Sequence, residues 1–369
     1  MVKNLFDKTS VKNLELKNRF IRSALWMKMA EEDGHINDEV IKLYEDLAKG
    51  GVGLILTGYA FISKDEQPNP RMLGIYDDSF TEEYKYLVDK VHNEGSKIAM
   101  QIVLGGSQNH HPNASAMNIF GPSEVKNIVT GITPKSVTAN DIRSIVKKFG
   151  DAALRVKKAG FDAVEIHAGH GYFLSQFLTP YYNKRDDEYG GSIQNRARII
   201  YEVITEVKSR VENDFPVMIK LNFDDFMDEN EGLTEEESLE VFKKIDELKV
   251  DIIEVSAVNE SSGKGLMPAL KGIKSIERQS YFKEVTAKIA SEVNAKVILM
   301  GGNRNVDLMD EILNTTDIEY FSLARPLLSE TDLINKWINN NDYIPKCVSC
   351  NKCWETEPNS CVFNRKIKK

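Results

Sequence analysis

Cysteine is missing from the first 346 of the 369 residues, and all four cysteines lie between Cys347 and Cys361. A disulfide framework would instead spread its cysteines through a small secreted domain. The chain also lacks a run of about 18 apolar residues that could form a transmembrane helix. Its N-terminal stretch lacks the apolar core of a secretory signal. These absences predict a cytoplasmic protein with no membrane partner.

Positive charge is in short supply as well, with 48 Lys and Arg against 56 Asp and Glu and a net charge of −8. This balance argues against nucleic acid as the main partner and favours a small-molecule substrate. Apolar residues make up 41% of the chain. A large core is therefore expected, in roughly two domains by length or in one α/β barrel of 250 or more residues. Whether the chain forms a homo-oligomer is left open.

Short apolar runs alternate with amphipathic stretches along the chain. The runs are too apolar for half-exposed strands, which indicates a parallel sheet buried on both faces. The expected strands are Arg19–Ser23, Gly53–Thr57, Lys97–Val103, Ala163–His167, Val217–Leu221, Ile252–Ser256, Lys296–Met300 and Tyr320–Leu323. The expected helices are Asp38–Lys49, Ser79–Glu94, Thr138–Ala159, Ser192–Val211, Thr234–Leu248, Arg278–Val293, Asn305–Asn314 and Thr331–Asn339.

Eight such units predict a (β/α)₈ TIM barrel over residues 1–340. A doubly wound open sheet is the alternative, but no GxGxxG motif follows the first strand. Leu5–Lys17 is expected to form a short hairpin that closes the barrel floor. Gly105–Lys135 is a long loop rich in glycine, asparagine, proline and serine, which indicates a lid or a binding loop. Residues 341–369 form a cysteine-rich C-terminal extension.

The strongest chemical signal lies at the end of the fourth strand. His167 ends that strand, and His170 and Tyr172 follow within five residues. In a barrel the C-terminal strand ends converge on one mouth, where two imidazoles and a phenol could hold and protonate a polarised substrate. A metal site would need a further ligand that the segment does not clearly supply. Two histidines that merely cap a loop are the simpler alternative.

The ends of the last two strands carry a phosphate signal. Gly301 and Gly302 follow one strand, and Ala324 and Arg325 follow the next. The loops after strands seven and eight are the usual phosphate site of these barrels. Backbone N–H groups beside glycines, together with a guanidinium, suit a phosphate dianion. A tight turn and a surface ion pair are the alternative interpretation.

Other strand ends suggest a cradle for a flat, anionic ligand. Gln101 offers both a donor and an acceptor, as a pyrimidine edge requires. Lys220 could stabilise the negative charge of a reduced flavin. Alternatively, Gln101 is a polar residue inside the barrel and Lys220 pairs with Glu254. The remaining candidate contacts at strand ends are Ser23, Ala24 and Tyr59.

The segment Ala159–Arg196, with AGFDAVEIHAGHGY, FLTP and DEYGGSIQNR, resembles the Old Yellow Enzyme family of NADH:flavin oxidoreductases. The resemblance extends from about Leu5 to Trp337. It implies an FMN-dependent barrel enzyme in which NAD(P)H reduces the flavin and an activated C=C bond receives the hydride. His167 and His170 match the family's substrate-anchoring pair, and Tyr172 matches its proton donor. The FMN contacts that the resemblance implies are Gln101, Lys220, Gly302 and Arg325.

Some positions depart from that family. Trp26 follows the first strand, where a proline and a small residue are common, and it could wall off part of the pocket together with Lys28. Lys220 stands where many members have arginine, so the bidentate geometry is lost. A second hypothesis is an amine dehydrogenase or demethylase of the trimethylamine type, with Trp26, Tyr59 and Tyr172 as an aromatic cage. A third is a non-catalytic flavin-binding or metal-sensing barrel.

The C-terminal cysteines have the spacing of a ligand set. They form the pattern Cys347-x2-Cys350-x2-Cys353-x7-Cys361. Four thiolates can bind a [4Fe–4S] cluster or Zn²⁺, and larger relatives in the resembled family place a cluster just after the barrel. Reduced thiols without a metal are the third alternative. With a cluster, a ferredoxin-like protein would be the expected electron donor.

Overall fold

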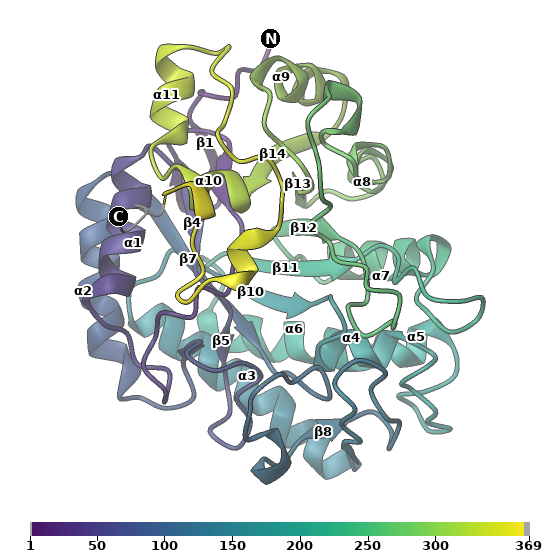
Figure 1. Ribbon diagram of the computed structural model, residues 1–369. Helices are drawn as coiled ribbons and strands as arrows, with labels where there is room; N and C mark the ends of the chain where they lie inside the picture. The colour runs from purple at the N-terminus through teal and green to yellow at the C-terminus, as the bar shows by residue number, and fades with distance from the viewer. Residues whose placement is uncertain (1, 365–369) are drawn as a thin grey trace.

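The structure, a computed structural model, describes residues 2–364. Within this range eight parallel strands form a closed barrel (Figure 1). In chain order they are β3 Phe20–Arg22, β4 Leu54–Leu56, β7 Lys97–Val103, β10 Ala163–Ala168, β11 Val217–Asn222, β12 Ile252–Ser256, β13 Lys296–Leu299 and β14 Ile318–Leu323. Pairing of β14 with β3 and of β7 with β10 closes the ring. The predicted (β/α)₈ barrel is confirmed, and the open sheet is wrong.

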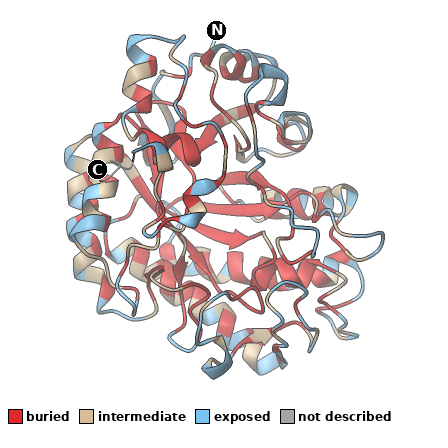
Figure 2. Cartoon of the chain, viewed as in Figure 1, coloured by how far each residue is buried: buried red, intermediate tan, exposed pale blue. Residues whose placement is uncertain are grey.

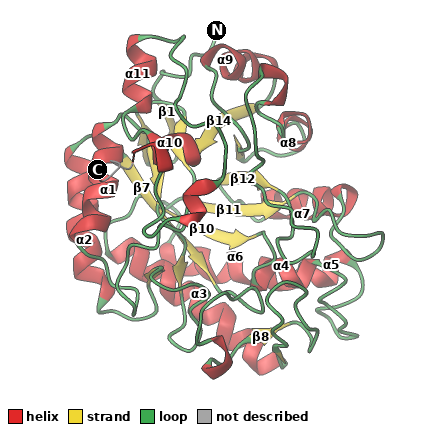
Figure 3. Cartoon of the chain, in the orientation of Figure 1, coloured by secondary structure: helices red, strands yellow, loops and turns green. Residues whose placement is uncertain are grey.

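Helices surround the barrel and connect successive strands (Figure 3). They are α1 Asp38–Lys49, α2 Phe80–Asn93, α3 Ala139–Lys158, α4 Phe173–Leu178, α5 Ile193–Arg196, α6 Arg198–Val211, α7 Glu235–Glu247, α8 Lys283–Ala290, α9 Val306–Thr315, α10 Arg325–Ser329 and α11 Leu333–Asn339. Capping boxes at Thr138 and Thr234 begin α3 and α7. Each threonine hydroxyl accepts an otherwise unpaired N–H of the first turn, which fixes where the helix begins.

One expected helix is much shorter than predicted. The sequence pattern covers Arg278–Val293, but α8 contains only Lys283–Ala290, and a 3₁₀ turn, η2 Ile276–Arg278, precedes it. Ser280 has a φ of 47°, in the left-handed region that a helix cannot include. The next residue, Tyr281, donates its backbone N–H to Gly301 O at 3.0 Å. The segment is therefore attached to the barrel mouth instead of continuing a helix.

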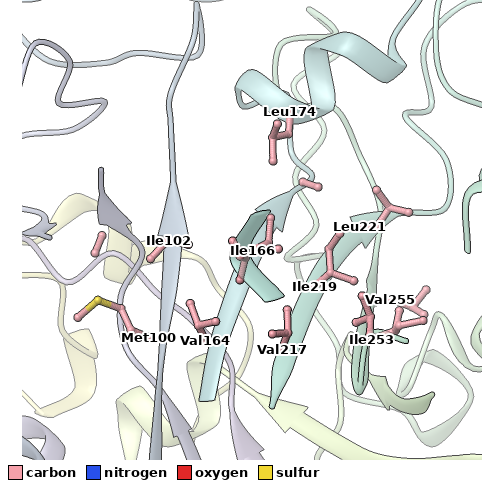
Figure 4. Close-up of a cluster of buried hydrophobic side chains, with 14 of the residues drawn as sticks. Met100, Ile102, Val164, Ile166, Leu174, Val217, Ile219, Leu221, Ile253 and Val255 are labelled. Carbon is pink, nitrogen blue, oxygen red and sulfur yellow. The ribbon is translucent and has the colours of Figure 1, made fainter. Parts of the chain in front are cut away.

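Side chains alternate along each strand between the barrel interior and the surrounding helices. Figure 4 shows a cluster of apolar side chains from neighbouring strands, including Met100 and Ile102 of β7, Val164 and Ile166 of β10, and Ile219 of β11. The residues between them have the opposite direction, because successive side chains of a strand point to opposite faces. These intervening residues are polar in the upper barrel, namely Gln101, Glu165, Lys220 and Glu254.

A hairpin closes the opposite end of the barrel. Strands β1 Thr9–Val11 and β2 Leu14–Leu16 pair antiparallel. Val11, Leu14 and Leu16 are buried in one cluster with barrel residues such as Ile21 and Leu54. The expected hairpin at the barrel floor is therefore confirmed. With the floor filled by apolar side chains, polar chemistry is confined to the C-terminal ends of the strands.

Several short elements extend the mouth. β5 Ala60–Phe61 pairs with β7, and β6 Leu73–Gly74 pairs with β5. The long loop after β7 holds η1 Ala114–Ala116, β8 Phe120–Gly121 and β9 Lys135–Ser136. The C-terminal segment, with η3 Lys352–Glu355 and η4 Val362–Asn364, runs over the mouth, and Figure 2 shows the buried strands beneath it. Residues 365–369 of the predicted extension lie outside the described range. No helix in that range is long and apolar enough to span a membrane.

Candidate active site

A cavity of about 440 Å³ opens at the C-terminal ends of the barrel strands. Its volume lies within the range of about 300–1,000 Å³ that is typical of small-molecule pockets. It brings together most of the residues expected from the sequence, namely Ser23, Ala24, Tyr59, Gln101, His167, His170, Tyr172, Lys220, Ala324 and Arg325. Trp26, which was expected to wall off part of the pocket, lines it as well. The other lining residues were not singled out from the sequence, namely Leu25, Asn69, His110, Glu260, Met267, Pro268, Ala269, Met300 and Trp354.

A smaller pocket adjoins this cavity and contains Gly301 and Gly302. The two share Ser23, Ala324 and Arg325 among their lining residues. Gly301 and Gly302 have φ values of 109° and 80°, and an added Cβ would lie 2.7 and 2.9 Å from the ring of Tyr281. Only glycine fits both the backbone and the space. Within residues 2–364 the amide of Gly302 has no hydrogen-bond acceptor, so it is free to meet an anion.

Two guanidinium groups line the smaller pocket. Arg325 donates from Nη1 to Leu270 O at 2.8 Å and also contacts Asn351 Oδ1. Arg304 donates from Nη1 to Ile273 O and to Cys347 O, each at 2.8 Å. Sequence reasoning missed Arg304, although it follows the Gly-Gly-Asn turn directly. A pair of buried arginines beside a glycine turn suits a phosphate dianion.

Lys220 is held by a buried ion pair. Its Nζ lies 3.1 Å from Glu254 Oε2 and 3.2 Å from Ser23 Oγ. Ser23 in turn donates to Glu254 Oε1 at 2.8 Å. The expected pair with Glu254 is therefore present, and Lys220 also lines the cavity, where its contact with a flavin stays a prediction. The ion pair offsets part of the cost of burying the two groups.

Gln101 is oriented by a buried carboxyl. Its Nε2 donates to Glu165 Oε2 at 2.6 Å. Burial, and then the nearby Glu254, raise the pKa of Glu165, while Lys220 opposes the shift. Because the amide nitrogen is held in this way, Gln101 keeps its carbonyl oxygen and one N–H for a ligand in the cavity.

The two histidines stand edge to face. Their ring centroids are 5.0 Å apart at an interplanar angle of 80°. Burial holds the pKa of each imidazole well below its usual value. The charge of Lys220 adds to this effect at His167, and the neighbouring His167 adds to it at His170. Both are therefore neutral at pH 7. His170 Nε2 lies 2.6 Å from Ser256 Oγ, whereas the buried Nδ1 of His167 has no partner in the described chain.

The hydroxyl of Tyr172 is hydrogen-bonded to the hydroxyl of a second tyrosine. The hydroxyl oxygens of Tyr172 and Tyr59 are 3.2 Å apart, and Asn69 Nδ2 donates to Tyr59 at 3.1 Å. Burial raises the pKa of both phenols above its usual value. Tyr172 is consequently protonated at neutral pH, and its ring centroid lies 5.1 Å from that of His167.

Comparison with known proteins agrees with this geometry. The profile of the NADH:flavin oxidoreductase / NADH oxidase family matches residues 4–342. The chain belongs to this family. It is 32% identical over 351 residues to an NADH oxidase from Thermoanaerobacter brockii, covering 94% of this chain and 53% of that protein. It is 30% identical over 370 residues to a cinnamate reductase from Clostridium sporogenes, covering 94% and 55%.

The chain therefore spans about half the length of these two relatives. Among solved structures, the Old Yellow Enzyme homologue from Zymomonas mobilis superimposes with a TM-score of 0.77 at 20% identity, covering 94% of this chain and 95% of that one. At this identity the likeness establishes the fold. The resemblance expected from Ala159–Arg196 is confirmed by family membership.

Membership of the NADH:flavin oxidoreductase family implies FMN, and the observed residues fit it. The smaller pocket would hold the phosphate, since Gly302 and the two arginines provide donors on one side. The larger cavity provides polar groups at its base, Gln101 and Lys220, for a flat ring. The smaller pocket lies at the ends of β13 and β14, where barrels of this kind usually bind phosphate.

Two tryptophans wall the cavity. Trp26 donates from Nε1 to Pro70 O at 3.0 Å, and Lys28 Nζ lies 4.8 Å from its ring centroid. Trp354 comes from the C-terminal segment, whose Asn359 donates from Nδ2 to Trp26 O at 2.7 Å. Trp354 was missed because it lies on a loop without periodicity, far from any barrel strand in the sequence.

The four cysteines line a third, small pocket, which also contains Arg325. Cys347 and Cys353 are buried, and burial raises the pKa of the Cys353 thiol, with Cys347 and Cys350 close enough to contribute. Within the described residues no group of three or more His, Cys, Asp or Glu is arranged to hold a metal ion. The thiols thus surround a common space without converging on a single point.

Proposed function

We propose that this chain is an FMN-dependent NAD(P)H oxidoreductase that reduces an activated C=C bond of the enone, enoate or nitroalkene type. One observation carries the proposal. The neutral pair His167 and His170 and the protonated Tyr172 line the same cavity as Lys220 and Arg325. Proton-donating groups and anion-binding groups therefore meet in a single space, as a reaction that delivers a hydride and a proton requires.

The cofactor side is assigned to the residues that provide cations and backbone donors. Gly301, Gly302 and Arg325, with Ala324, would hold the phosphate. Gln101 and Lys220 would bind the ring edge, flanked by Ser23, Ala24 and Tyr59. When bound, FMN supplies a two-electron carrier between NAD(P)H and the alkene. A positive Lys220 would favour the anionic reduced state, since it stabilises negative charge in a buried place.

The substrate side is assigned to the two imidazoles and the phenol. Each neutral imidazole has one N–H to donate to a carbonyl or nitro oxygen. Such donation withdraws electrons from the conjugated alkene and makes its β-carbon more electrophilic. Tyr172, kept protonated by burial, would then donate its proton to the α-carbon. Tyr172 donates to the hydroxyl of Tyr59, and Asn69 donates to that same Tyr59 oxygen, which holds the tyrosine pair in place.

The test uses the FMN-loaded protein with NADH or NADPH and 2-cyclohexen-1-one under anaerobic conditions. The wild-type protein should consume one reduced nicotinamide per alkene. Tyr172→Phe should lower the rate of alkene reduction by about 10²-fold and leave the rate of flavin reduction by NAD(P)H unchanged. Tyr86→Phe, at a side chain that is 53% exposed on α2, serves as the matched control. Unchanged alkene reduction in Tyr172→Phe would exclude the proton-donor role.

An amine dehydrogenase or demethylase is the second candidate, and one observation favours it. Trp26, Tyr59 and Tyr172 all line the same cavity, as an aromatic cage for a cation requires. Oxidation of a tertiary or primary amine by the FMN-loaded protein, measured as anaerobic bleaching of the flavin, separates this function from alkene reduction. The absence of bleaching by amines, together with turnover of the enone, would exclude it.

We further propose that the cysteines bind a [4Fe–4S] cluster and not zinc. A cluster needs four thiolates around a shared space, which the small pocket provides. A ferredoxin-like donor would be a partner of this form. Anaerobically purified protein should contain about four iron and four sulfide ions per chain; zinc alone, or neither iron nor sulfide, would contradict the cluster.

A further inference from the structure

Glu260 is an acidic side chain inside the large cavity that the mechanism above does not use. It lies in the loop after β12 and is half-buried, with its accessible part on the cavity wall. Of the described residues that line this cavity, it is the one acid. An ionisable carboxyl among apolar and aromatic walls is costly unless something in the cavity interacts with it.

The backbone around Glu260 is fixed on both sides. Val258 has a φ of 79°, in a region that β-branched residues avoid, and its N–H donates to Asp224 O at 2.8 Å. Asn259 is fully buried, and its N–H donates to Asp225 O at 3.0 Å. Ser261 accepts from Asn127 Nδ2 at 2.7 Å. A strained residue held by surrounding bonds is typical of functional sites, and here it directs the loop so that Glu260 lines the cavity.

Glu260 lies on the substrate side of the cavity. Its charge contributes to the raised pKa of both Tyr59 and Tyr172, so it is close to the two phenols. The groups that face it are those two phenols, the Gln108 amide and Lys220. His110 is linked to it through Gln108, with 3.3 Å between the Nε2 atoms of Gln108 and His110. None of these neutralises it, since Lys220 is paired with Glu254 and burial lowers the pKa of His110.

The charge of the carboxyl is available near neutral pH. Burial raises the pKa of Glu260 to about 7, and Gln108 and Lys220 oppose the shift. A cation placed beside it would favour the ionised form, whereas a carboxylate would be repelled or would have to bring a proton. The aromatic walls, Trp26 and Trp354 among them, add a surface that attracts cations.

We propose that Glu260 selects the substrate by charge, so that the cavity prefers acceptors that carry a positively charged group and disfavours those that carry a carboxylate. This inference rests on the proposed function, because it assigns the substrate class of the same cavity. The cinnamate reductase from Clostridium sporogenes, by contrast, is named for a carboxylate substrate. Glu260 acts on binding, and the hydride and proton transfers are those already described.

The experiment compares three para-substituted cinnamaldehydes that differ in charge. The substituents are trimethylammonium, its neutral isostere tert-butyl, and carboxylate. Binding to the full-length FMN-loaded protein is measured by calorimetry at pH 8, where Glu260 is mostly ionised. In the wild-type protein the cationic aldehyde should bind at least about tenfold more tightly than the tert-butyl compound, with the carboxylate weakest. In Glu260→Gln the three should agree within about threefold, with binding of the neutral compound unchanged.

Glu229→Gln is the matched control, because Glu229 is exposed and lies outside the cavity. It should keep the wild-type preference and so exclude a mere effect of net charge. Equal binding of the three aldehydes by the wild-type protein, or a cationic preference that survives Glu260→Gln, would overturn the inference. If the preference is present but no aldehyde is reduced with NAD(P)H, the proposed function fails while the role of Glu260 stands.

Discussion

Lys220 and Glu254 occupy paired positions on adjacent strands, β11 and β12, with 3.1 Å between Nζ and Oε2. The side chains are 4% and 0% exposed. The barrel thus places Glu254 on the next strand, opposite the buried lysine at the base of its cavity. Its dependence on that partner leads to a stability prediction.

Glu254→Gln should destabilise the apoprotein strongly. The substitution leaves Lys220 buried without its counter-charge, and breaking such a pair costs about 3–5 kcal/mol. Replacing both residues, as in Lys220→Met with Glu254→Gln, should recover part of the loss because no unpaired charge remains. The free energy of unfolding from urea titration measures both effects. A single mutant as stable as the wild type would show that water, and not Glu254, compensates Lys220.

Arg325→Ala should weaken FMN binding. The guanidinium lines both the large cavity and the smaller pocket with Gly302, and the loss of a charge-assisted contact to phosphate corresponds to tenfold or more in affinity, or about 1.5–3 kcal/mol. Quenching of FMN fluorescence on titration into apoprotein gives the dissociation constant. Lys283→Ala, at an exposed position at the start of α8, should bind FMN as the wild type does. If Arg325→Ala binds FMN as tightly as the wild type does, the phosphate binds elsewhere.

Gly302→Ala should also reduce FMN affinity, for a steric reason. The added Cβ would lie 2.9 Å from the Tyr281 ring, so the turn must move. Gly191→Ala is the matched control, since Gly191 has a similar φ of 78° and no atom within 4 Å of the added Cβ. Both variants should lose about 1 kcal/mol of stability from the left-handed backbone. Only Gly302→Ala should bind FMN more weakly, and a parallel loss in Gly191→Ala would point to a general loss of stability.

Glu66 makes the stability depend on pH. It is 2% exposed, and burial raises its pKa to about 8 against the amides of Gly105 and Gly106. Because the folded state holds this proton more tightly than the unfolded state, the stability contribution is present below the unfolded pKa of about 4.5 and is lost as pH rises toward 8. The free energy of unfolding of Glu66→Gln, relative to that of the wild type, should therefore rise by a few kcal/mol from pH 5 to pH 8. Urea unfolding at both pH values measures this, and a difference that does not change with pH would contradict the raised pKa.

Most of the barrel could be predicted from the sequence because its strands are continuous apolar runs. Helix α1 begins where predicted because Asn37 accepts the N–H of Val40. The helix predicted to begin at Arg278 is wrong in its first turn, because the apolar periodicity gives no sign of the left-handed backbone at Ser280. The hydrogen bond from Tyr281 to Gly301 sets that backbone conformation. The conformation of that segment is set by tertiary contacts, which a periodic sequence pattern does not reveal.

The residues of the site also fall into those that the sequence pattern could predict and those that only tertiary contacts bring to the cavity. His167, Gln101 and Lys220 were predictable, because a strand end fixes both position and direction. Glu260 and Asn69 lie on loops and Trp354 on the short 3₁₀ turn η3, and they were not predicted as site residues, since only the folded chain brings them to the cavity. Residues on strands account for the general chemistry of the site, and residues on loops account for what enters it.

The bond from Asn359 to the carbonyl of Trp26 joins positions 333 residues apart, across the wall of the cavity. A polypeptide still being synthesised can pair its barrel strands, the last of which ends at Leu323, before this bond is available. The cavity wall at Trp26 and Trp354 is then incomplete while the scaffold already stands. We therefore expect the newly made protein to capture its cofactor late, after residue 359 has left the ribosome.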